Sequence, residues 1–314
     1  MPGALASVAL GLVALYLGAE WLVKGASRLA LAWRVAPLVV GLTVVAFGTS
    51  TPELLVSVLG AIQGKVDLAL GNIIGSNIFN IAFILGLAAL LRPLVVKVDL
   101  VRREVPVMAL VAVVLYLLGS DGILSRLDGA LLLAGLITYI WYLYALARQE
   151  RPEATTEYVE FQKAQGLQGN GTGRNLLLVA GGVLTLVIGA QALLSGSITL
   201  ARALGVSELV IGLTLVAAGT SLPELATSVV AALRHETDIS VGNVVGSNTF
   251  NIAGILGLAA LLQPIPVPDL GSSYWVMLGV SLLLWVMIST GRLLDRLEAG
   301  ILLLAYVVFV WQLF

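Results

Sequence analysis

The sequence contains no cysteine and only one histidine, and 11% of its 314 residues are charged. The absence of cysteine excludes disulfides, thiolate metal sites and cysteine nucleophiles. No His–Asp, Ser–His or Ser–Lys pair lies within its apolar stretches, so we do not expect an enzyme. The formal net charge is −1, and the lack of a basic patch argues against a nucleic-acid partner.

What the chain has in excess is apolar sequence: 59% of its residues are hydrophobic. A soluble domain is rarely so apolar, and apolar runs of about 20 residues have the length of a membrane-spanning helix. The sequence therefore predicts an all-α integral membrane protein in a lipid bilayer. Ten runs carry this prediction, at 4–24, 36–63, 68–91, 104–119, 127–147, 175–200, 207–233, 239–262, 273–290 and 296–313.

A polar, glycine-rich stretch divides the ten runs into two sets of five. We assign residues 1–147 to the first set, 148–174 to a linker and 175–314 to the second. Fourteen of the 17 Lys and Arg residues lie in the first, third, fifth, seventh and ninth connections. Such a bias predicts that these connections, including the linker, lie in the cytoplasm. Both termini then lie on the other side of the plasma or inner membrane, in the extracellular space or the periplasm.

The two halves repeat each other without a gap at an offset of 171 residues. GLTVVAFGTSTPELLVSVL at 41–59 agrees with 212–230 at 13 of 19 positions, and 71–91 agrees with 242–262 at 17 of 21. Because five spans per half is an odd number, the second half is inverted relative to the first. An inverted repeat of this kind is the architecture of many secondary transporters.

Each copy of the repeat carries one acidic residue inside an apolar run, Glu53 and Glu224. A charge at membrane depth is expensive and usually marks a functional site, and no Lys or Arg lies in these spans to neutralise it. Residues three or four apart share a helix face, so each carboxylate is expected to belong to a stripe of oxygen-bearing side chains along one face of its helix. The stripes are Thr49, Ser50, Glu53 and Ser57, with Ser76 and Asn80 on the next span, and Thr220, Ser221, Glu224 and Ser228, with Ser247 and Asn251 on the next span.

A proline precedes each carboxylate, at Pro52 and Pro223. Proline disrupts the helical hydrogen bond to the carbonyl four residues back, here that of Gly48 or Gly219. The carbonyls around Ala46, Gly48, Ala217 and Gly219 are therefore expected to face the same site. All of these groups are hard oxygen donors, which suit Na⁺ or Ca²⁺ better than zinc, copper or iron. Two carboxylates are neutralised by one Ca²⁺ or by two Na⁺, so each ion is bound at the expense of the other.

Some polar residues have plainer interpretations. We interpret four asparagines as residues that hydrogen-bond one helix to another rather than as ligands. The glycines of GNIIG and GNVVG are interpreted equally as close-packing positions and as positions that give ions access to the site. Glu20 is expected to anchor the first span at the interface, and His235 to be solvated in a charged loop. The four asparagines are Asn72, Asn77, Asn243 and Asn248.

The paired motifs GTSTPELLVS with GNIIGSNIFN, and GTSLPELATS with GNVVGSNTFN, resemble the paired α-repeats of the sodium/calcium exchangers in the cation/calcium antiporter superfamily. The resemblance implies an antiporter without a cofactor, in which the first and sixth helices slide across the other eight. The short linker departs from animal members, which carry calcium-sensing domains there. The cation-binding positions that the resemblance implies are Ala46, Thr49, Ser50, Glu53, Ser76, Asn80, Ala217, Thr220, Ser221, Glu224, Ser247 and Asn251.

The predicted function is therefore exchange of Na⁺ for Ca²⁺ by alternating access, carried out by a monomer. A proton/calcium antiporter of the same superfamily is the second hypothesis, although such proteins usually carry GN-x-x-E where this chain has GTSTPE and GTSLPE. A potassium-dependent exchanger is the third. A passive cation channel belongs to a different class, and an inverted repeat with carboxylates at membrane depth fits it less well.

Overall fold

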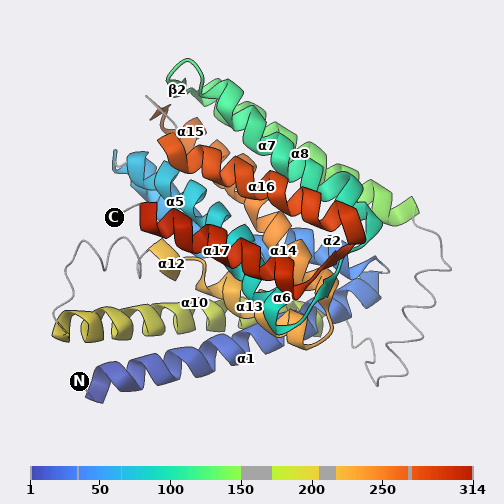
Figure 1. The fold of residues 1–314 in the computed structure, drawn as a ribbon, viewed down its shortest axis with the longest axis vertical. Helices are drawn as coiled ribbons and strands as arrows, with labels where there is room; N and C mark the ends of the chain where they lie inside the picture. The colour runs from blue at the N-terminus through green and yellow to red at the C-terminus, as the bar shows by residue number, and fades with distance from the viewer. Residues whose placement is uncertain are drawn as a thin grey trace.

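The computed structural model describes residues 2–33, 35–64, 66–149, 172–204, 217–267 and 271–312. Figure 1 shows that these residues form a bundle of helices with a few very short strands. The elements of the first half are α1 (Pro2–Trp33), α2 (Pro37–Val40), η1 (Gly41–Val45), α3 (Ala46–Thr49), α4 (Thr51–Ile62), α5 (Val66–Ile78), η2 (Phe79–Leu85), α6 (Gly86–Leu91), β1 (Leu94–Val95), η3 (Leu100–Glu104), α7 (Val105–Leu118), β2 (Ile123–Leu124) and α8 (Arg126–Gln149).

The second half contains a matching series of elements. In both halves η denotes a π-helical stretch. The elements of the second half are α10 (Thr172–Ala203), α12 (Ala217–Gly219), α13 (Leu222–Leu233), α14 (Thr237–Thr249), η5 (Phe250–Leu256), α15 (Gly257–Leu262), β3 (Ile265–Pro266), α16 (Gly271–Gly291), β4 (Leu293–Leu294) and α17 (Arg296–Gln312). The predicted linker lies almost wholly outside the described residues, as does the start of the predicted span 207–233.

Six helical stretches of the described chain are long and apolar enough to cross a membrane, and a seventh is added if the bent pair 37–49 and 51–62 counts as one span. The chain is therefore a multi-pass membrane protein. The predicted end of the first span at residue 24 is wrong, because α1 continues to Trp33. Lys24 and Arg28 end the apolar run without ending the helix, since Leu29 and Ala30 beyond them remain buried.

Two helices are broken immediately before their carboxylates. α3 and α4 meet at Ser50, whose φ of −78° and ψ of 11° leave the helical region. Residues 37–49 and 51–62 are bent by 51° relative to each other at this point. α13 begins after Ser221, which has nearly the same backbone angles, φ −89° and ψ 11°. In each case proline occupies one of the first two positions of the new helix, where its missing N–H costs nothing.

The centre of the bundle is formed by α5–η2–α6 and α14–η5–α15. Within an apolar 18-residue window, 78% of the first and 83% of the second are buried, against 28% for α1 and 22% for α8. The outer helices instead expose large apolar side chains such as Trp141, Leu177 and Val307, as helices in contact with lipid do. Both central helices contain a seven-residue π-helical stretch, η2 and η5, and π-helical segments are frequent at functional sites.

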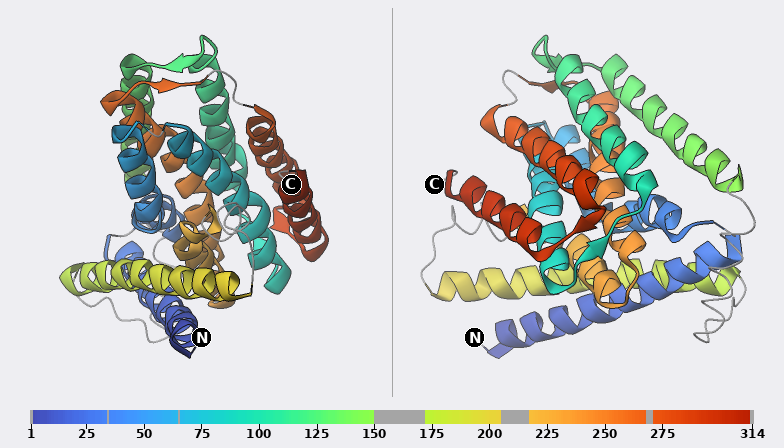
Figure 2. Two further views of the ribbon diagram at one scale, coloured as in Figure 1. Left: turned by 90° about the vertical axis from the view of Figure 1, so that its left-hand side faces the viewer. Right: turned by 45° about the vertical axis from the view of Figure 1, so that its right-hand side comes forward.

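α1 and α10 run along one side of the bundle in all three ribbon views (Figures 1 and 2). They pack through glycines spaced seven residues apart, which let the two backbones approach closely. A Cβ at Gly18 would lie 2.8 Å from the backbone nitrogen of Leu186, and one at Gly182 would lie 2.7 Å from that of Leu22. We call this contact the glycine seam; it consists of Gly11, Gly18, Gly25, Gly182, Gly189 and Gly196.

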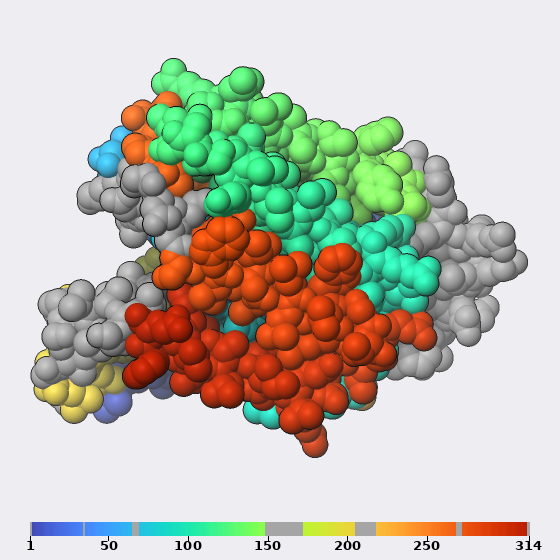
Figure 3. Space-filling model, turned by 45° about the horizontal axis from the view of Figure 1, so that its top comes forward, coloured from blue at the N-terminus to red at the C-terminus, as the bar shows by residue number. Residues whose placement is uncertain are grey.

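Two antiparallel two-stranded sheets connect the halves of the chain. β1 pairs with β4 through Leu94 and Leu294, and β2 pairs with β3 through Leu124 and Ile265. The start of α1 and the end of α17 lie at one end of the molecule, and the last turn of α8 lies at the other (Figure 1). In the space-filling view α16 and α17 lie beside α7 and α8 on one face (Figure 3).

Candidate functional site

The two predicted carboxylates, Glu53 and Glu224, lie in the first turns of α4 and α13 and are completely buried. The N-terminus of a helix carries a partial positive charge that stabilises a carboxylate. The helix breaks created by Pro52 and Pro223 therefore explain how each carboxylate is held without a Lys or Arg partner.

The carboxylates of the two halves are joined by exchanged serine hydroxyls. Ser50, at the start of α4, donates to Glu224 Oε1 at 2.9 Å, and Ser221, at the start of α13, donates to Glu53 Oε1 at 2.8 Å. Neither serine makes the usual side-chain cap on its own helix. The starts of α4 and α13 thus face one another, with both carboxylates between them.

The other carboxylate oxygens are unpaired, although both are buried. Buried polar atoms are normally hydrogen-bonded, so an unpaired set calls for an explanation. Six such oxygens belong to predicted site residues, and they form three pairs related by the offset of 171. They are Glu53 Oε2, Glu224 Oε2, Ser76 Oγ, Ser247 Oγ, Asn80 Oδ1 and Asn251 Oδ1.

The threonines and the first asparagine of each glycine motif form a second set of contacts between the halves. Thr49 donates to Asn243 Oδ1 at 3.0 Å, and Asn243 Nδ2 donates to Ser228 Oγ at 3.0 Å. The counterpart is longer at one step: Thr220 donates to Asn72 Oδ1 at 3.4 Å, and Asn72 Nδ2 donates to Ser57 Oγ at 2.9 Å. Asn72 and Asn243 therefore hold hydroxyl-bearing residues of both stripes in place.

The predicted asparagines of the site are also tied across the halves. Asn80 Nδ2 donates to Asn248 Oδ1, and Asn251 Nδ2 donates to Asn77 Oδ1, both at 3.0 Å. Because each amide nitrogen is occupied in this way, the amide oxygens of Asn80 and Asn251 remain available. The structure thus places Asn77 and Asn248 in direct contact with predicted site residues.

The predicted carbonyls are less free than the prolines suggest. The carbonyl of Ala46 accepts the N–H of Ser50 at 3.0 Å, and that of Gly48 accepts the hydroxyl of Thr51 at 2.9 Å. A carbonyl has two lone pairs, so the carbonyl of Gly48 keeps one acceptor position open, whereas that of Ala46 also accepts the hydroxyl of Thr49 at 3.3 Å. Ala217 begins α12, close before the break at Ser221.

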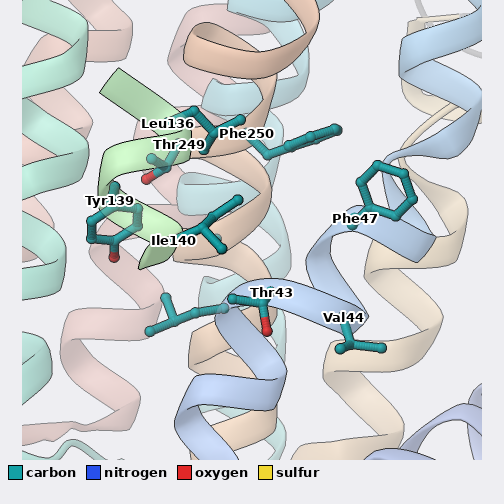
Figure 4. Close-up of a pocket in the computed structure, with 10 residues that line it drawn as sticks. Thr43, Val44, Phe47, Leu136, Tyr139, Ile140, Thr249 and Phe250 are labelled. Atoms are coloured by element: carbon teal, nitrogen blue, oxygen red, sulfur yellow. The ribbon is translucent and has the colours of Figure 1, made fainter. Parts of the chain in front are cut away.

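A cavity of about 310 Å³ lies between the η1–α3 stretch, α8 and the junction of α14 with η5, and Figure 4 shows its lining. Phe47, Leu136 and Phe250 form much of its wall. Its two threonines, Thr43 and Thr249, already donate to backbone carbonyls. The lining contains no carboxylate to offset the charge of a cation, so this largely apolar cavity is not the candidate site.

Sequence reasoning missed one buried carboxylate. Glu104, at the end of η3, is almost completely buried and accepts a hydrogen bond from Tyr139. Glu104 lies at the boundary of the predicted span 104–119, directly after Arg102 and Arg103, so nothing in its sequence context indicates burial. His235 is exposed as predicted, but it contacts Arg92, and Glu20 pairs with Arg234.

Comparison with known proteins gives the family. The family model described as sodium/calcium exchanger protein matches residues 3–145 and 174–314. Among curated relatives, the sodium/calcium exchanger MaX1 of Methanosarcina acetivorans is 36% identical over 97% of both chains. The putative antiporter CaxA of Alkalimonas amylolytica is 38% identical over 98% of this chain and 97% of its own.

A solved structure agrees over nearly the whole chain. The sodium-calcium exchanger NCX_Mj, soaked with Na⁺ and Ca²⁺, has a TM-score of 0.83 at 32% sequence identity and covers 99% of this chain and 98% of its own. The family consists of exchangers, which are membrane antiporters and not enzymes. The chain therefore belongs to the sodium/calcium exchanger protein family.

Proposed function

We propose that this protein is a secondary active antiporter that exchanges Na⁺ for Ca²⁺ at a site built from both halves of the chain. The observation that carries the proposal is the set of six buried, unpaired oxygens around the two carboxylates. Ca²⁺ prefers six to eight oxygen ligands, and carbonyls of Ala46 and Ala217 and hydroxyls of the threonines and serines complete the supply. The proposed ligands are the twelve positions that the resemblance implies.

Charge provides the reason for exchange. Two buried carboxylates without a basic partner require about two positive charges, since an uncompensated charge in a low-dielectric site is very costly. One Ca²⁺ or two Na⁺ meet that requirement equally well, so occupancy by one ion excludes the other. Net transport then needs only that the loaded site opens to alternate sides.

We further propose ten spans arranged as two inverted repeats, with the linker in the cytoplasm and both termini outside. The paired contacts at the offset of 171 and the two cross-connecting sheets support the repeat. The Lys and Arg bias supports the orientation. We also propose that the first and sixth helices slide together across the other eight. The glycine seam supports this motion, because it joins α1 and α10 into one unit that lies beside the central helices.

Potassium is not expected to take part. Asn80 and Asn251 are both neutral, whereas related exchangers that use potassium have an acidic residue at the position of Asn251. An additional K⁺ would bring surplus positive charge into the site with nothing to offset it.

The test is Ca²⁺ uptake by the purified chain in liposomes loaded with Na⁺, K⁺ or protons in excess over the outside. We expect only the Na⁺ gradient to drive uptake, uptake to saturate with Ca²⁺, and replacement of K⁺ by choline to change nothing. Uptake driven by protons without Na⁺ would replace this proposal with a proton/calcium antiporter. Flux that needs no counter-ion would identify a channel.

A further inference from the structure

Four buried asparagines connect the two central helices, and we call them the asparagine relay: Asn77, Asn80, Asn248 and Asn251. Besides the contacts to Asn80 and Asn251 described above, the two inner members bind each other's backbone. Asn77 Nδ2 donates to the carbonyl of Asn248 at 3.3 Å, and Asn248 Nδ2 donates to the carbonyl of Asn77 at 3.2 Å. All four amides are therefore linked between α5–η2 and α14–η5.

The two backbone carbonyls in this relay, those of Asn77 and Asn248, determine the orientation of every side-chain amide. A backbone carbonyl can only accept a hydrogen bond, so the carbonyl of Asn77 requires the nitrogen of Asn248. The oxygen of Asn248 must then face Asn80, which requires the nitrogen of Asn80. The one group of Asn80 left over is its oxygen, which is buried without a partner. The same sequence of steps runs from the carbonyl of Asn248 through Asn77 to Asn251.

We infer that Asn77 and Asn248 are positioning residues that make Asn251 and Asn80, respectively, present oxygen rather than N–H to the transported cation. This inference rests on the proposed function. The dependence crosses between the halves: Asn248 orients Asn80, although it lies on the same helix as Asn251. Without Asn248, the Asn80 amide is free to rotate and direct its N–H groups at the cation.

A purely structural role makes a different prediction. If Asn77 and Asn248 only held α5 and α14 together, replacing either one would disturb Asn80 and Asn251 alike. It would also weaken Na⁺ and Ca²⁺ binding to the same degree. The relay instead predicts coupling between specific crossed pairs. It also predicts a larger loss for Ca²⁺ than for Na⁺, because the energy of an ion near the wrong end of an amide dipole grows with ionic charge.

The experiment is a pair of double-mutant cycles on the full-length purified chain, with dissociation constants for Ca²⁺ and for Na⁺ measured by calorimetry. The first cycle combines Asn248→Leu with Asn80→Ala, and the second combines Asn248→Leu with Asn251→Ala. We expect Asn248→Leu to weaken Ca²⁺ binding by about tenfold, the lower end of what loss of an orienting partner costs at a metal site. In the first cycle the double variant should bind no more weakly than the weaker of the two single variants. In the second, the two losses should multiply.

Ser281→Ala is the matched control, because Ser281 is also buried but donates within α16 to the carbonyl of Met277. It should leave both dissociation constants unchanged. If Asn248→Leu does not fold, Asn248→Ala replaces it in both cycles.

Two results would overturn the relay: losses that multiply in the first cycle, or equal weakening of Na⁺ and Ca²⁺. A wild-type chain that binds Na⁺ but not Ca²⁺ would instead count against the proposed exchange. The same two cycles read with Na⁺ would still decide whether Asn248 orients Asn80.

Discussion

The glycine motifs of α5 and α14, residues 71–77 and 242–248, have nearly the same sequence and different surroundings. Asn72 is half-buried, whereas its counterpart Asn243 is completely buried. A Cβ at Gly246 would lie 2.5 Å from the carbonyl oxygen of Leu42, while no described atom lies within 4 Å of a Cβ at Gly75. Among the described residues, the two glycine motifs therefore differ in how closely backbone packs against them.

The closed state of α14 is made by backbone contact with α2 and η1. Gly242 and Gly246 lie directly against the carbonyls of Leu38 and Leu42, and Thr49 follows in the same stretch with its hydrogen bond to Asn243. The segment related to α2 and η1, residues 208–216, lies outside the described residues. On the described side, backbone packing against Leu38 and Leu42 closes the glycine motif of α14.

The largest expected effect tests what the two halves share. Glu53→Gln and Glu224→Gln are each expected to abolish Na⁺-driven Ca²⁺ uptake in liposomes. Unit charges 4 Å apart interact by about 4 kcal/mol at an effective dielectric of 20, and loss of one carboxylate forfeits that attraction for each charge on the ion. Glu20→Gln, which removes only the partner of Arg234, is the control and should transport normally. Wild-type uptake in either site variant would mean that the site has been misplaced.

A smaller effect tests the difference in packing. Gly246→Ala should destabilise the protein by about 1–3 kcal/mol because its methyl group overpacks against backbone. Gly75→Ala should be neutral or stabilising, by up to about 1 kcal/mol, because alanine favours a helix over glycine. Thermal unfolding in one detergent measures both. Equal shifts of the midpoint in the two variants would show that the two motifs are packed alike.

The smallest effect concerns access from outside. The chain has no native cysteine, so Gly71→Cys and Gly242→Cys each provide a unique thiol. Thiol reactivity follows exposure, and Gly71 is exposed while Gly242 is buried. An impermeant maleimide added outside intact cells should therefore label position 71 faster. Gly173→Cys at the exposed start of α10 is the control for orientation and should react only after the membrane is opened. Faster labelling of position 242 from outside would reverse the assignment of the two sides.

Much of this fold could be predicted from sequence, because apolar runs, prolines and an internal repeat are local signals. The helix breaks lie beside Pro52 and Pro223 as expected, and Glu53 and Glu224 are brought together. The end of α1 could not be predicted from hydropathy, since Lys24 interrupts the apolar run while leaving helix formation unaffected. The two-residue strands are also too short to leave a pattern.

The hydrogen-bond partners within the site could not be predicted. Ser50 binds Glu224 and Asn251 binds Asn77, each across 174 positions of the sequence. These contacts depend on how helices are rotated about their axes, which the spacing of residues along one helix does not specify. Asn77 and Asn248 do connect two helices, as predicted, and the structure adds their contacts to the amides of Asn80 and Asn251.

The glycine seam has a consequence for how the protein is made. The glycine faces of α1 and α10 fit each other more closely than they fit lipid tails. Because α10 is synthesised later, α1 obtains this partner only after the ribosome has reached α10. The first half of the chain thus enters the membrane with one helix still unmatched, and the second half supplies the matching surface. Assembly of the two halves is in this sense closer to the pairing of two subunits than to the folding of one domain after another.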